Sequence, residues 1–486
     1  MEYTSDKISQ IDIAQKTIKL SLSDRHSKLL MIVSLLISDL LAIFISIFSA
    51  VFIRNILPLS TNVTIEKYIN LFPLIIFFVG IYAIRDLYNG IGVSPINELK
   101  NLTISTSLVF FLFTTLSFLG KTSETYSRSL FIITYVLALF LIPTVRTFIR
   151  WILIRMNIWG TPVVILGFGS KGQHILQYLR SNPHMGMRPF MVVNGNVDEV
   201  YRQKWQIPFL SFKEVKNIGV RTAILIPNEF SVTLRKKALY DLKMGFERLI
   251  LISDLEWIGS SALISHDMQG VLGLEVEQNL LDPYQKTAKR ILDLLLVVIG
   301  SIILFPFFLF IWLAIILDSK GPAIYKQARI GKNHKIIHIY KFRTMVSNAA
   351  EVLEDLLKNN CELSGEWDKL HKLKNDPRIT RVGRFLRKTS LDELPQLINI
   401  LIGEMSIVGP RPIVEDEIPH YKDVFELYKQ VEPGLTGMWQ VSGRSDTSYE
   451  NRVQLDEYYI RHWSIWMDIY IIVKTFWILI KGKGAY

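Results

Sequence analysis

Cysteine is almost absent from this chain of 486 residues, which contains only Cys361. One cysteine cannot form a disulfide within the chain, so nothing in the composition indicates an oxidising compartment. The nine histidines also lack the spacings that structural zinc sites use. The composition therefore argues against a disulfide-rich secreted protein and against a zinc enzyme.

Charged residues are sparse at 20%, whereas hydrophobic residues make up 50% of the chain and the mean hydropathy is +0.27. These values exceed those of an ordinary soluble protein, so part of the chain is expected in a bilayer. The formal net charge is +11. In a membrane protein this charge suits anionic lipid headgroups or phosphorylated substrates, and no nucleic-acid partner is expected.

Four apolar segments in the first third of the chain approach or meet the length of about 20 residues that a membrane-spanning helix needs. They cover residues 29–53, 68–84, 102–119 and 130–145. We therefore expect a cytosolic segment over 1–28 and a four-helix transmembrane bundle over 29–155. Asp39 lies inside the first segment, where its charge is costly, so it should face another helix.

Basic residues flank both ends of the predicted bundle and indicate its orientation. They are Lys7, Lys16, Lys19, Arg25 and Lys28 before it, and Arg146, Arg150 and Arg155 after it. Because cytoplasmic flanks carry an excess of lysine and arginine, both ends are expected on the cytoplasmic side. The remaining two thirds of the chain would then be cytosolic.

From Thr161 the pattern changes to that of an alternating α/β domain. A buried strand at 163–166 leads into the turn Gly167-Phe168-Gly169-Ser170-Lys171-Gly172 and a helix over 173–179. Further strands are expected at 190–193, 222–226 and 248–252, with a helix over 232–243. The result is a small Rossmann-like module over 161–260. No carboxylate follows its second strand, so a regulatory or dimerising role is preferred over nucleotide binding.

A second long apolar stretch, 291–317, has basic residues on both sides and Pro306 near its middle. A full crossing would separate the following domain from the cytosol, whereas a helix broken at Pro306 could enter one leaflet and return. We expect this re-entrant hairpin. The last apolar segment, 463–480, contains Asp468 and Lys474 and is expected to lie at the membrane interface.

The segment Arg387-Lys388-Thr389-Ser390-Leu391-Asp392-Glu393 places two adjacent carboxylates beside several cations. The ordinary interpretation is a capping box that begins at Ser390, with acidic residues in the first helical turn. The catalytic interpretation is phosphate chemistry. A carboxylate can attack phosphorus to give an acyl phosphate, and a neighbouring carboxylate can hold Mg²⁺ against a diphosphate.

Arg411 stands between Pro410 and Pro412, and this stiff backbone would aim its guanidinium with little ordering cost.

Five ordered motifs carry a family resemblance: Gly321-Pro322-Ala323-Ile324-Tyr325, Tyr340-Lys341-Phe342-Arg343-Thr344-Met345, the Asp392-Glu393 segment, Gly409-Pro410-Arg411-Pro412, and Pro433-Gly434-Leu435-Thr436-Gly437-Met438-Trp439-Gln440-Val441-Ser442-Gly443-Arg444. On these motifs the chain resembles the polyprenyl-phosphate hexose-1-phosphate transferases, the long form of the bacterial monotopic phosphoglycosyl transferases.

The resemblance implies roles for individual residues. Asp392 would be the covalent nucleophile, and Glu393 would assist it and hold Mg²⁺ together with Asp392. The substrate phosphates would contact Lys341, Arg343, Arg387, Arg411 and Arg444. Asp456 could orient Arg444, although an exposed carboxylate is the ordinary expectation, and Pro306 would form the membrane kink. The catalytic domain is expected to be α-rich and to span 283–486.

The resemblance also implies a location, a reaction and its partners. The protein would be a multi-pass protein of the bacterial inner membrane, with the catalytic domain on the cytosolic face. Hexose 1-phosphate, with galactose as the preferred sugar, would pass from a UDP-sugar to undecaprenyl phosphate and so start O-antigen, capsule or exopolysaccharide synthesis. A homodimer is possible. The alternatives are a glucose 1-phosphate transferase of this family and a non-catalytic polysaccharide assembly scaffold. A nucleotide-sugar dehydratase or epimerase is disfavoured, because no Tyr-x-x-x-Lys pair occurs between Thr161 and Asp282.

Overall fold

The computed structural model describes most of the chain, with gaps. The described residues are 2–56, 72–120, 127–193, 205, 207–210, 220–227, 246–252, 263–268, 271–276, 283–359, 376–442 and 448–481. The chain divides into two compact units, Met1–Glu256 and Trp257–Tyr486, and each is described by itself.

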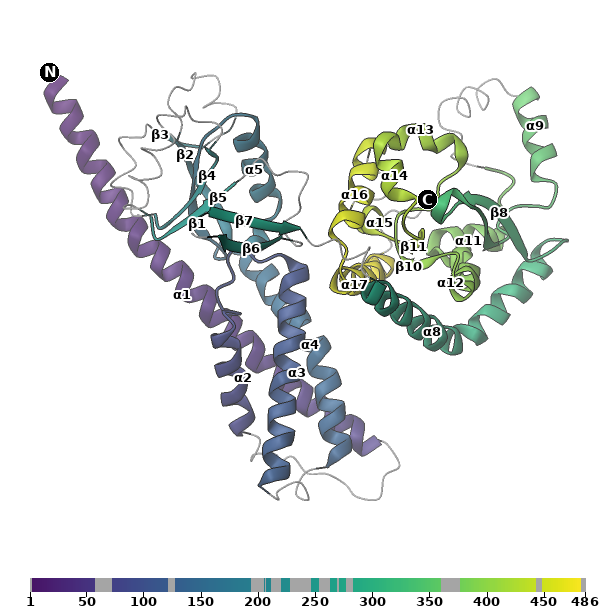
Figure 1. Ribbon diagram of the computed structural model, residues 1–486, viewed down its shortest axis with the longest axis horizontal. Helices are drawn as coiled ribbons and strands as arrows, with labels where there is room; N and C mark the ends of the chain where they lie inside the picture. The colour runs from purple at the N-terminus through teal and green to yellow at the C-terminus, as the bar shows by residue number, and fades with distance from the viewer. Residues whose placement is uncertain are drawn as a thin grey trace. The chain divides into compact units, whose positions relative to one another are not determined.

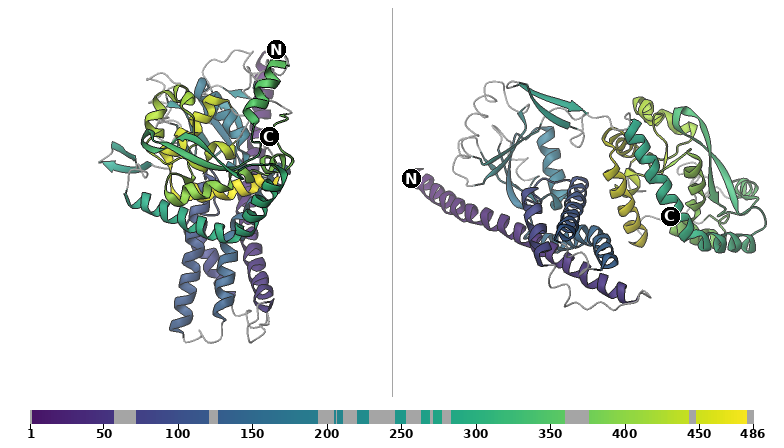
Figure 2. Two further views of the ribbon diagram at one scale, coloured as in Figure 1. Left: turned by 90° about the vertical axis from the view of Figure 1, so that its right-hand side faces the viewer. Right: turned by 60° about the horizontal axis from the view of Figure 1, so that its bottom comes forward.

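The first unit begins with helices that lie side by side (Figures 1 and 2). Their bounds are α1 Glu2–Ile56, α2 Phe72–Ile84, α3 Pro95–Leu119 and α4 Arg128–Arg155. Helix α1 packs along α4, and α3 contacts both α2 and α4. The apolar part of α1, α3 and α4 are each long enough to cross a membrane, as predicted. Helix α2 is shorter than a span, and the start of the second predicted segment lies outside the described residues.

Helix α1 buries a stripe of small residues within the bundle. Ser38, Ala42, Ser46 and Ala50 are spaced four residues apart and are all fully buried. This spacing places them on one helix face, and small side chains allow neighbouring helix backbones to approach closely, as in other membrane bundles. The stripe explains how helices with little amphipathic character pack tightly against each other.

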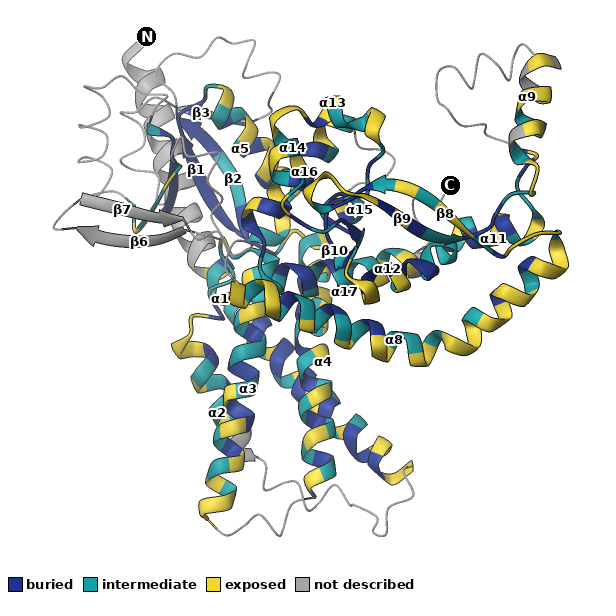
Figure 3. Ribbon diagram, turned by 45° about the vertical axis from the view of Figure 1, so that its right-hand side comes forward, coloured by how far each residue is buried: buried dark blue, intermediate teal, exposed yellow. Residues whose placement is uncertain are grey.

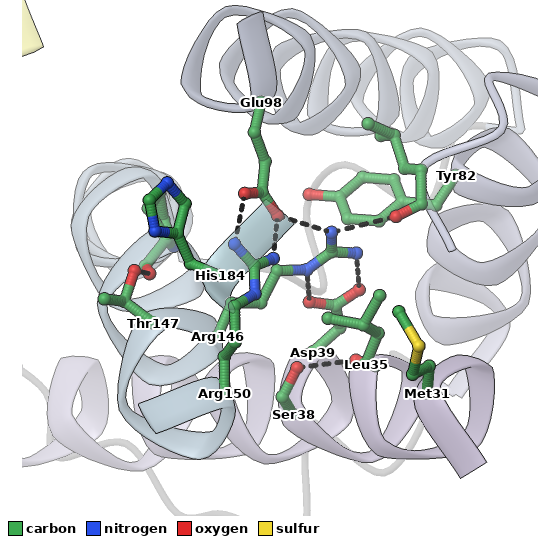
Figure 4. A network of polar contacts seen from close by, with 12 residues as sticks. Met31, Leu35, Ser38, Asp39, Tyr82, Glu98, Arg146, Thr147, Arg150 and His184 are labelled. Carbon is green, nitrogen blue, oxygen red and sulfur yellow. Dashed lines mark hydrogen bonds and ion pairs between the residues drawn. The ribbon is translucent and has the colours of Figure 1, made fainter. Parts of the chain in front are cut away.

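A network of buried charges joins three helices of the bundle (Figure 4). Arg146 of α4 donates from Nε to Asp39 of α1 at 2.6 Å, and Arg150 donates to Glu98 of α3 at 2.6 and 2.8 Å. Asp39 therefore faces another helix, as predicted. Arg146 and Arg150, which the sequence analysis counted in the basic flank, are buried in this network. Of that predicted flank, Arg155 remains exposed.

The α/β module follows the bundle in the same unit. Its elements are β1 Thr161–Leu166, α5 Ser170–Ser181, η2 Pro183–Met185, β2 Met187–Val193, β3 Phe209–Leu210, β4 Thr222–Leu225 and β5 Arg248–Leu251. The five strands are parallel in the order β3-β2-β1-β4-β5, an order found in Rossmann folds. The sequence predicted a Rossmann-like module without a strand order. Gly167 has φ of 102°, as the turn into α5 requires. The predicted helix over 232–243 lies outside the described residues.

The second unit contains the candidate catalytic domain. Its first elements are the hairpin β6 Leu263–Met268 and β7 Val271–Val276, the helix α8 Pro283–Asp318, the hairpin β8 Ile324–Ile330 and β9 Ile336–Phe342 with η6 Lys332–His334 between its strands, and α9 Ala349–Asn359. The next are α11 Arg381–Thr389, η7 Leu391–Gln396, α12 Leu397–Ile402 and β10 Ser406–Val408. The last are η8 Glu415–Glu417, α13 Ile418–Tyr421, η9 Lys422–Val424, α14 Phe425–Tyr428, β11 Gly434–Thr436, α15 Met438–Ser442, α16 Tyr449–His462 and α17 Ile465–Lys481. The domain is α-rich, as predicted.

Helix α8 continues through Pro306, so the expected break in the helix is absent. Figure 1 instead shows α8 as a curved helix along one side of its domain, which is consistent with the hydrogen bond that an interior proline removes. Val297 of the first half packs in a core with Ile400, and Ile315 of the second half packs in another core with Leu386. Both halves therefore rest on the same domain.

The outer face of α8 is apolar and exposed (Figure 3). Its exposed large side chains around Pro306 are Ile302, Ile303, Phe305, Phe307, Leu309 and Phe310. Helix α17 has exposed apolar residues in its second half, including Phe476 and Trp477, whereas Trp463 and Asp468 are buried. Asp468 pairs with Lys289 of α8 at 2.6 Å. The start of the predicted interfacial segment is therefore part of the protein core.

Candidate active site

The adjacent carboxylates of Asp392 and Glu393 lie in the 3-10 turn η7. Helix α11 ends at Ser390, which has a left-handed φ of 57°, and η7 follows at once. The Ser390 side chain makes no capping hydrogen bond, so the capping-box interpretation is wrong. The motif is a tight turn between two helices, and its carboxylates do not serve as the first turn of an α-helix.

Close backbone packing fixes the helix that precedes this turn. The side chain of Thr380 caps α11 by accepting from the Gly383 N–H at 2.9 Å, and the Thr380 N–H donates to the carbonyl of Thr344 at 3.1 Å. A Cβ atom at Gly383 would overlap the backbone of Thr344. Glycine is therefore required here, because α11 lies directly on the segment that follows β9.

Asp392 is half-buried, and its electrostatic surroundings are unusual for a carboxylate. Burial, and then the neighbouring charge of Glu393, raise the pKa of Asp392 to about 6, although the charges of Lys341 and Arg387 act in the opposite direction. A carboxyl group with this pKa is mostly ionised at neutral pH. It is also less hydrated than a surface carboxylate, which favours nucleophilic attack.

Two cations from different elements approach the carboxylates. Lys341, near the end of β9, has its Nζ atom 2.8 Å from Oε1 of Glu393. Arg387, in the last turn of α11, donates from Nε to Oγ1 of Thr344 at 2.9 Å. We call Asp392, Glu393, Lys341 and Arg387 the carboxylate cluster. The structure thus brings together four residues that the sequence identified in two separate motifs.

Asn399 is a positioning residue that the sequence analysis missed. It is fully buried, and its Oδ1 accepts from the Tyr340 N–H at 3.0 Å. Its Nδ2 donates to the carbonyl of His338 and to Glu404, both at 2.8 Å. These bonds hold α12, which follows the carboxylates, against the strand that carries Lys341. A single polar residue inside the apolar run 397–402 is the feature that could have revealed it.

A second group of charged and aromatic residues lies around Trp439. The guanidinium carbon of Arg411 lies 5.4 Å from the centre of the Trp439 ring, and that of Arg452 lies 4.4 Å from it. Asp456 is fully buried and accepts from the Tyr421 hydroxyl at 2.8 Å. Burial raises the pKa of Asp456 to about 7. We call Arg411, Arg452, Trp439 and Asp456 the arginine cluster.

Comparison with known proteins identifies the family. The bacterial sugar transferase family matches residues 284–482, and a family described as CoA-binding domain matches residues 83–214. The chain is 35% identical over 418 residues to the undecaprenyl-phosphate galactose phosphotransferase of Salmonella typhimurium, covering 80% of this chain and 82% of that protein. The chain belongs to the bacterial sugar transferase family. This transferase therefore acts on a sugar-phosphate donor and a polyprenyl phosphate acceptor at a membrane.

Other relatives of the transferase differ in the sugar that their names specify. The UDP-galactose-lipid carrier transferase of Erwinia amylovora is 34% identical, covering 80% of this chain and 82% of that protein. The UDP-glucose:undecaprenyl-phosphate glucose-1-phosphate transferase of Xanthomonas campestris pv. campestris is 30% identical, covering 85% and 86%. The family assignment thus fixes the reaction class, whereas the names of these relatives specify different sugars.

Arg343 of the transferase has a different position from the one that the sequence predicted. It is buried, and its Nη1 and Nη2 atoms donate to the carbonyls of Lys320 and Ser319 at 2.9 and 2.7 Å. These carbonyls follow the end of α8, so the guanidinium ties the membrane helix to β9. Gly321 has φ of 120°, and a Cβ atom there would overlap Nη1 of Arg343. Arg343 is therefore a structural residue of the α8–β8 turn.

Of the remaining predicted site residues of the transferase, two belong to the arginine cluster and one lies outside the described residues. Arg411 and Asp456 belong to the arginine cluster, and Asp456 is buried, contrary to the expectation that it is exposed. Arg444 lies outside the described residues. Arg452 was not predicted, although its place beside an aromatic motif could have suggested it.

The carboxylate cluster would supply only part of the ligand set of a magnesium ion. Among the described residues no group of three His, Cys, Asp or Glu side chains gathers to form a metal site. Mg²⁺ in phosphoryl-transfer enzymes is commonly held by one or two carboxylates together with substrate phosphates and water. The repulsion between Asp392 and Glu393, which contributes to the raised pKa of Asp392, is also what a cation would relieve.

Proposed function

We propose that the protein transfers galactose 1-phosphate from UDP-galactose to undecaprenyl phosphate and releases UMP. The single observation that carries this proposal is the carboxylate cluster, in which the charges of a second carboxylate and two cations act on Asp392 and Lys341 contacts Glu393. The names of the Salmonella and Erwinia relatives favour galactose. UDP-glucose is the second candidate donor, because the Xanthomonas and Escherichia coli relatives are named for it.

In the first step, an oxygen of the Asp392 carboxylate attacks the phosphorus that bears the sugar. The bond from this phosphorus to the bridging oxygen breaks, and its electron pair leaves with UMP. The product is an acyl phosphate that joins Asp392 to the hexose phosphate. The positive charges of Lys341 and Arg387 oppose the negative charge that develops on the transferring group.

In the second step, an oxygen of undecaprenyl phosphate attacks the same phosphorus. The acyl phosphate bond breaks, Asp392 regains its carboxylate, and the sugar leaves as undecaprenyl-diphosphate hexose. Because the donor reacts and UMP departs before the acceptor reacts, the kinetics are ping-pong. The lipid product would begin a repeat unit of O-antigen, capsule or exopolysaccharide.

Glu393 and Asp392 would hold Mg²⁺ together with phosphate oxygens of the donor. When bound, Mg²⁺ neutralises charge on the departing phosphate and orients it in line with the attacking oxygen. Lys341 already contacts Glu393 at 2.8 Å, so it fixes the direction in which that carboxylate points. This leaves the neighbouring Asp392 as the nucleophile.

The β8–β9 hairpin gives a path for the donor between the two clusters. Tyr325 pairs with Lys341, and Arg329 pairs with Ile337, so Lys341 and Arg329 lie on one face of the hairpin, four residues or about 13 Å apart. Arg329 lies near Arg411 of the arginine cluster. Burial, and then the positive charge of Arg411, lower the pKa of Arg329. We infer that the UMP half of the donor reaches toward Arg411, with Arg444 as a further phosphate ligand.

The arrangement of α8 supports a re-entrant position in the cytoplasmic leaflet of the inner membrane. Both halves of this helix pack on the same domain, and the exposed apolar face lies around Pro306. A helix that enters and leaves on one side keeps the carboxylate cluster on the cytosolic side, where UDP-sugars are available. A regulatory or dimerising role for the α/β module, and with it a homodimer, is part of this proposal.

The proposal is tested by measuring UMP release from UDP-galactose, UDP-glucose and their N-acetylated counterparts. The full chain in membranes is supplied with Mg²⁺ and undecaprenyl phosphate, and Asp392→Ala serves as the inactive control. UMP release by the parent with UDP-galactose alone is expected. Release with UDP-glucose alone would assign the other hexose, and no release with any donor would favour the non-catalytic assembly scaffold.

A further inference from the structure

A cavity of about 360 Å³ lies beside the first turns of α8, apart from the carboxylate cluster. It is formed where α8 meets the end of α12, the start of β10 and the segment before β11. Its charged lining residues are Lys286, Lys289, Arg290, Asp293, Lys332 and Glu432. Four cations against two carboxylates make this lining basic, and the transfer mechanism uses none of these residues.

Most of these charges have a partner within the protein. Lys289 pairs with Asp468, and Lys332 pairs with Glu432 at 2.7 Å. Asp293 accepts from the Ser406 hydroxyl at 2.7 Å and from the Ile407 N–H at 3.1 Å.

Within the described ranges, the other two cations of the lining, Lys286 and Arg290, are not paired with a carboxylate in this way. Lys286 is exposed, and it has no carboxylate partner among the residues that the structure describes. Arg290 donates to the carbonyls of Ile400 and Leu401 at 2.6 and 2.9 Å, so its positive charge is not balanced by a carboxylate there. The cavity therefore presents an excess of positive charge to any ligand that enters it.

The position of the cavity along α8 points to the level of the lipid headgroups. The residues of α8 that line the cavity lie within 286–293, where the sequence changes from basic to apolar. Directly beyond it, Ile291 and Leu295 of α8 are exposed, and so is Ile402 at the end of α12. A basic cavity next to exposed aliphatic side chains matches the two ends of a phospholipid, whose phosphate is anionic and whose chains are apolar.

We propose that this cavity binds the phosphate headgroup of an anionic membrane lipid, with Lys286 and Arg290 as the cations that contact it. The acyl or prenyl chain would extend along the exposed face of α8. The site is separate from the transfer reaction and requires only that α8 contacts a membrane. Because Arg290 also holds the last carbonyls of α12, a bound lipid would be adjacent to the helix that follows Glu393.

The test is photo-crosslinking of the full chain in nanodiscs that contain phosphatidylglycerol with a photoreactive group near the phosphate. Crosslinks are expected in the peptides that contain 286–293 and 403–406. Lys286→Gln should reduce them roughly fivefold, the effect of one basic residue near an anionic surface. Thr287→Phe, which fills the cavity mouth without changing charge, should also reduce them. Because both positions are exposed, neither variant is expected to prevent folding.

The matched control is Lys320→Gln, which removes an exposed lysine just beyond the other end of α8. An equal loss in this control would overturn the site, because it would indicate only general attraction to an anionic surface. Equal crosslinking by a phosphatidylcholine probe, or full protection by inorganic phosphate, would overturn the assignment to an anionic lipid. Displacement by undecaprenyl phosphate but not by unlabelled phosphatidylglycerol would also overturn the proposal, because the cavity would then serve the transfer reaction.

Discussion

Asn399 accepts a hydrogen bond from the backbone N–H of Tyr340 at 3.0 Å, and this contact sets the position of the carboxylate turn relative to β9. The two residues are 59 positions apart in the sequence. Tyr340 precedes Lys341, and α12 with Asn399 directly follows the turn that contains Glu393. The amide of one asparagine thus fixes the distance across which Lys341 reaches Glu393.

Replacing Asn399 with alanine should lower both stability and activity. The change leaves the Tyr340 N–H and the His338 carbonyl without their partner, so we expect a loss of about 2–4 kcal/mol in the free energy of unfolding. Asn399→Asp keeps the acceptor but places a buried carboxylate oxygen against the His338 carbonyl and the Glu404 carboxylate, so its effect should be at least as large. The measurement is thermal unfolding in detergent together with the initial rate of UMP release. Unchanged stability in Asn399→Ala would contradict the positioning role.

Replacing Lys341 with methionine should reduce the rate of UMP release by roughly 10²–10³-fold, the usual effect of removing one preorganised charge from an active site. The change frees the Glu393 carboxylate and removes a positive charge near Asp392. Lys341→Arg restores the charge and should recover part of the rate. Lys335→Met, an exposed lysine at the far end of the hairpin, is the matched control and should retain the parent rate.

Gly321→Ala should destabilise the catalytic domain by about 1–3 kcal/mol. The residue has φ of 120°, which costs strain with any other side chain, and the added methyl group would displace the guanidinium of Arg343 from the end of α8. Gly300→Ala in the middle of α8 is the control, because nothing lies within 4 Å of its added Cβ atom. In denaturant titrations, only Gly321→Ala should show a lower free energy of unfolding than the parent. Equal stability of the two would contradict the structural role of Arg343.

The buried carboxyl group of Asp456 should make stability depend on pH. Its folded-state pKa of about 7 lies above the unfolded value of about 4, so the folded state binds more protons between these values. The stability contribution is therefore complete below about pH 4 and is lost as the pH rises to about 7. Asp456→Asn should flatten this part of the profile. Parent and variant are compared by thermal unfolding across pH 4 to 8, and parallel profiles would contradict the prediction.

The sequence allowed the residues with local patterns to be predicted. Gly167 follows a buried strand and opens a helix, and from this and the later apolar strands an α/β module was predicted, whereas the strand order came from the structure. Asp392 and Glu393 were identified because they are adjacent and flanked by cations. Asp39 was expected to face another helix because a charge inside an apolar span needs a partner, and it does.

The errors concern contacts between residues that are far apart in the chain. Arg146 looked like a cytoplasmic flank because it ends an apolar run, yet it pairs with a residue 107 positions earlier. Arg343 stands in a motif with Lys341, but it follows the end of β9 and donates to the carbonyls of Ser319 and Lys320, so only Lys341 of the two contacts a carboxylate of the cluster. Pro306 predicted a break, whereas tertiary packing of both halves of α8 keeps the helix continuous. Sequence alone gives no measure of such packing.

The most direct test of the account is the mass of the protein after incubation with UDP-galactose and Mg²⁺ in the absence of acceptor lipid. The account predicts an added hexose phosphate that maps to Asp392, disappears when undecaprenyl phosphate is supplied, and is absent in Asp392→Asn. Full turnover by Asp392→Asn, or an adduct on any other residue, would contradict it.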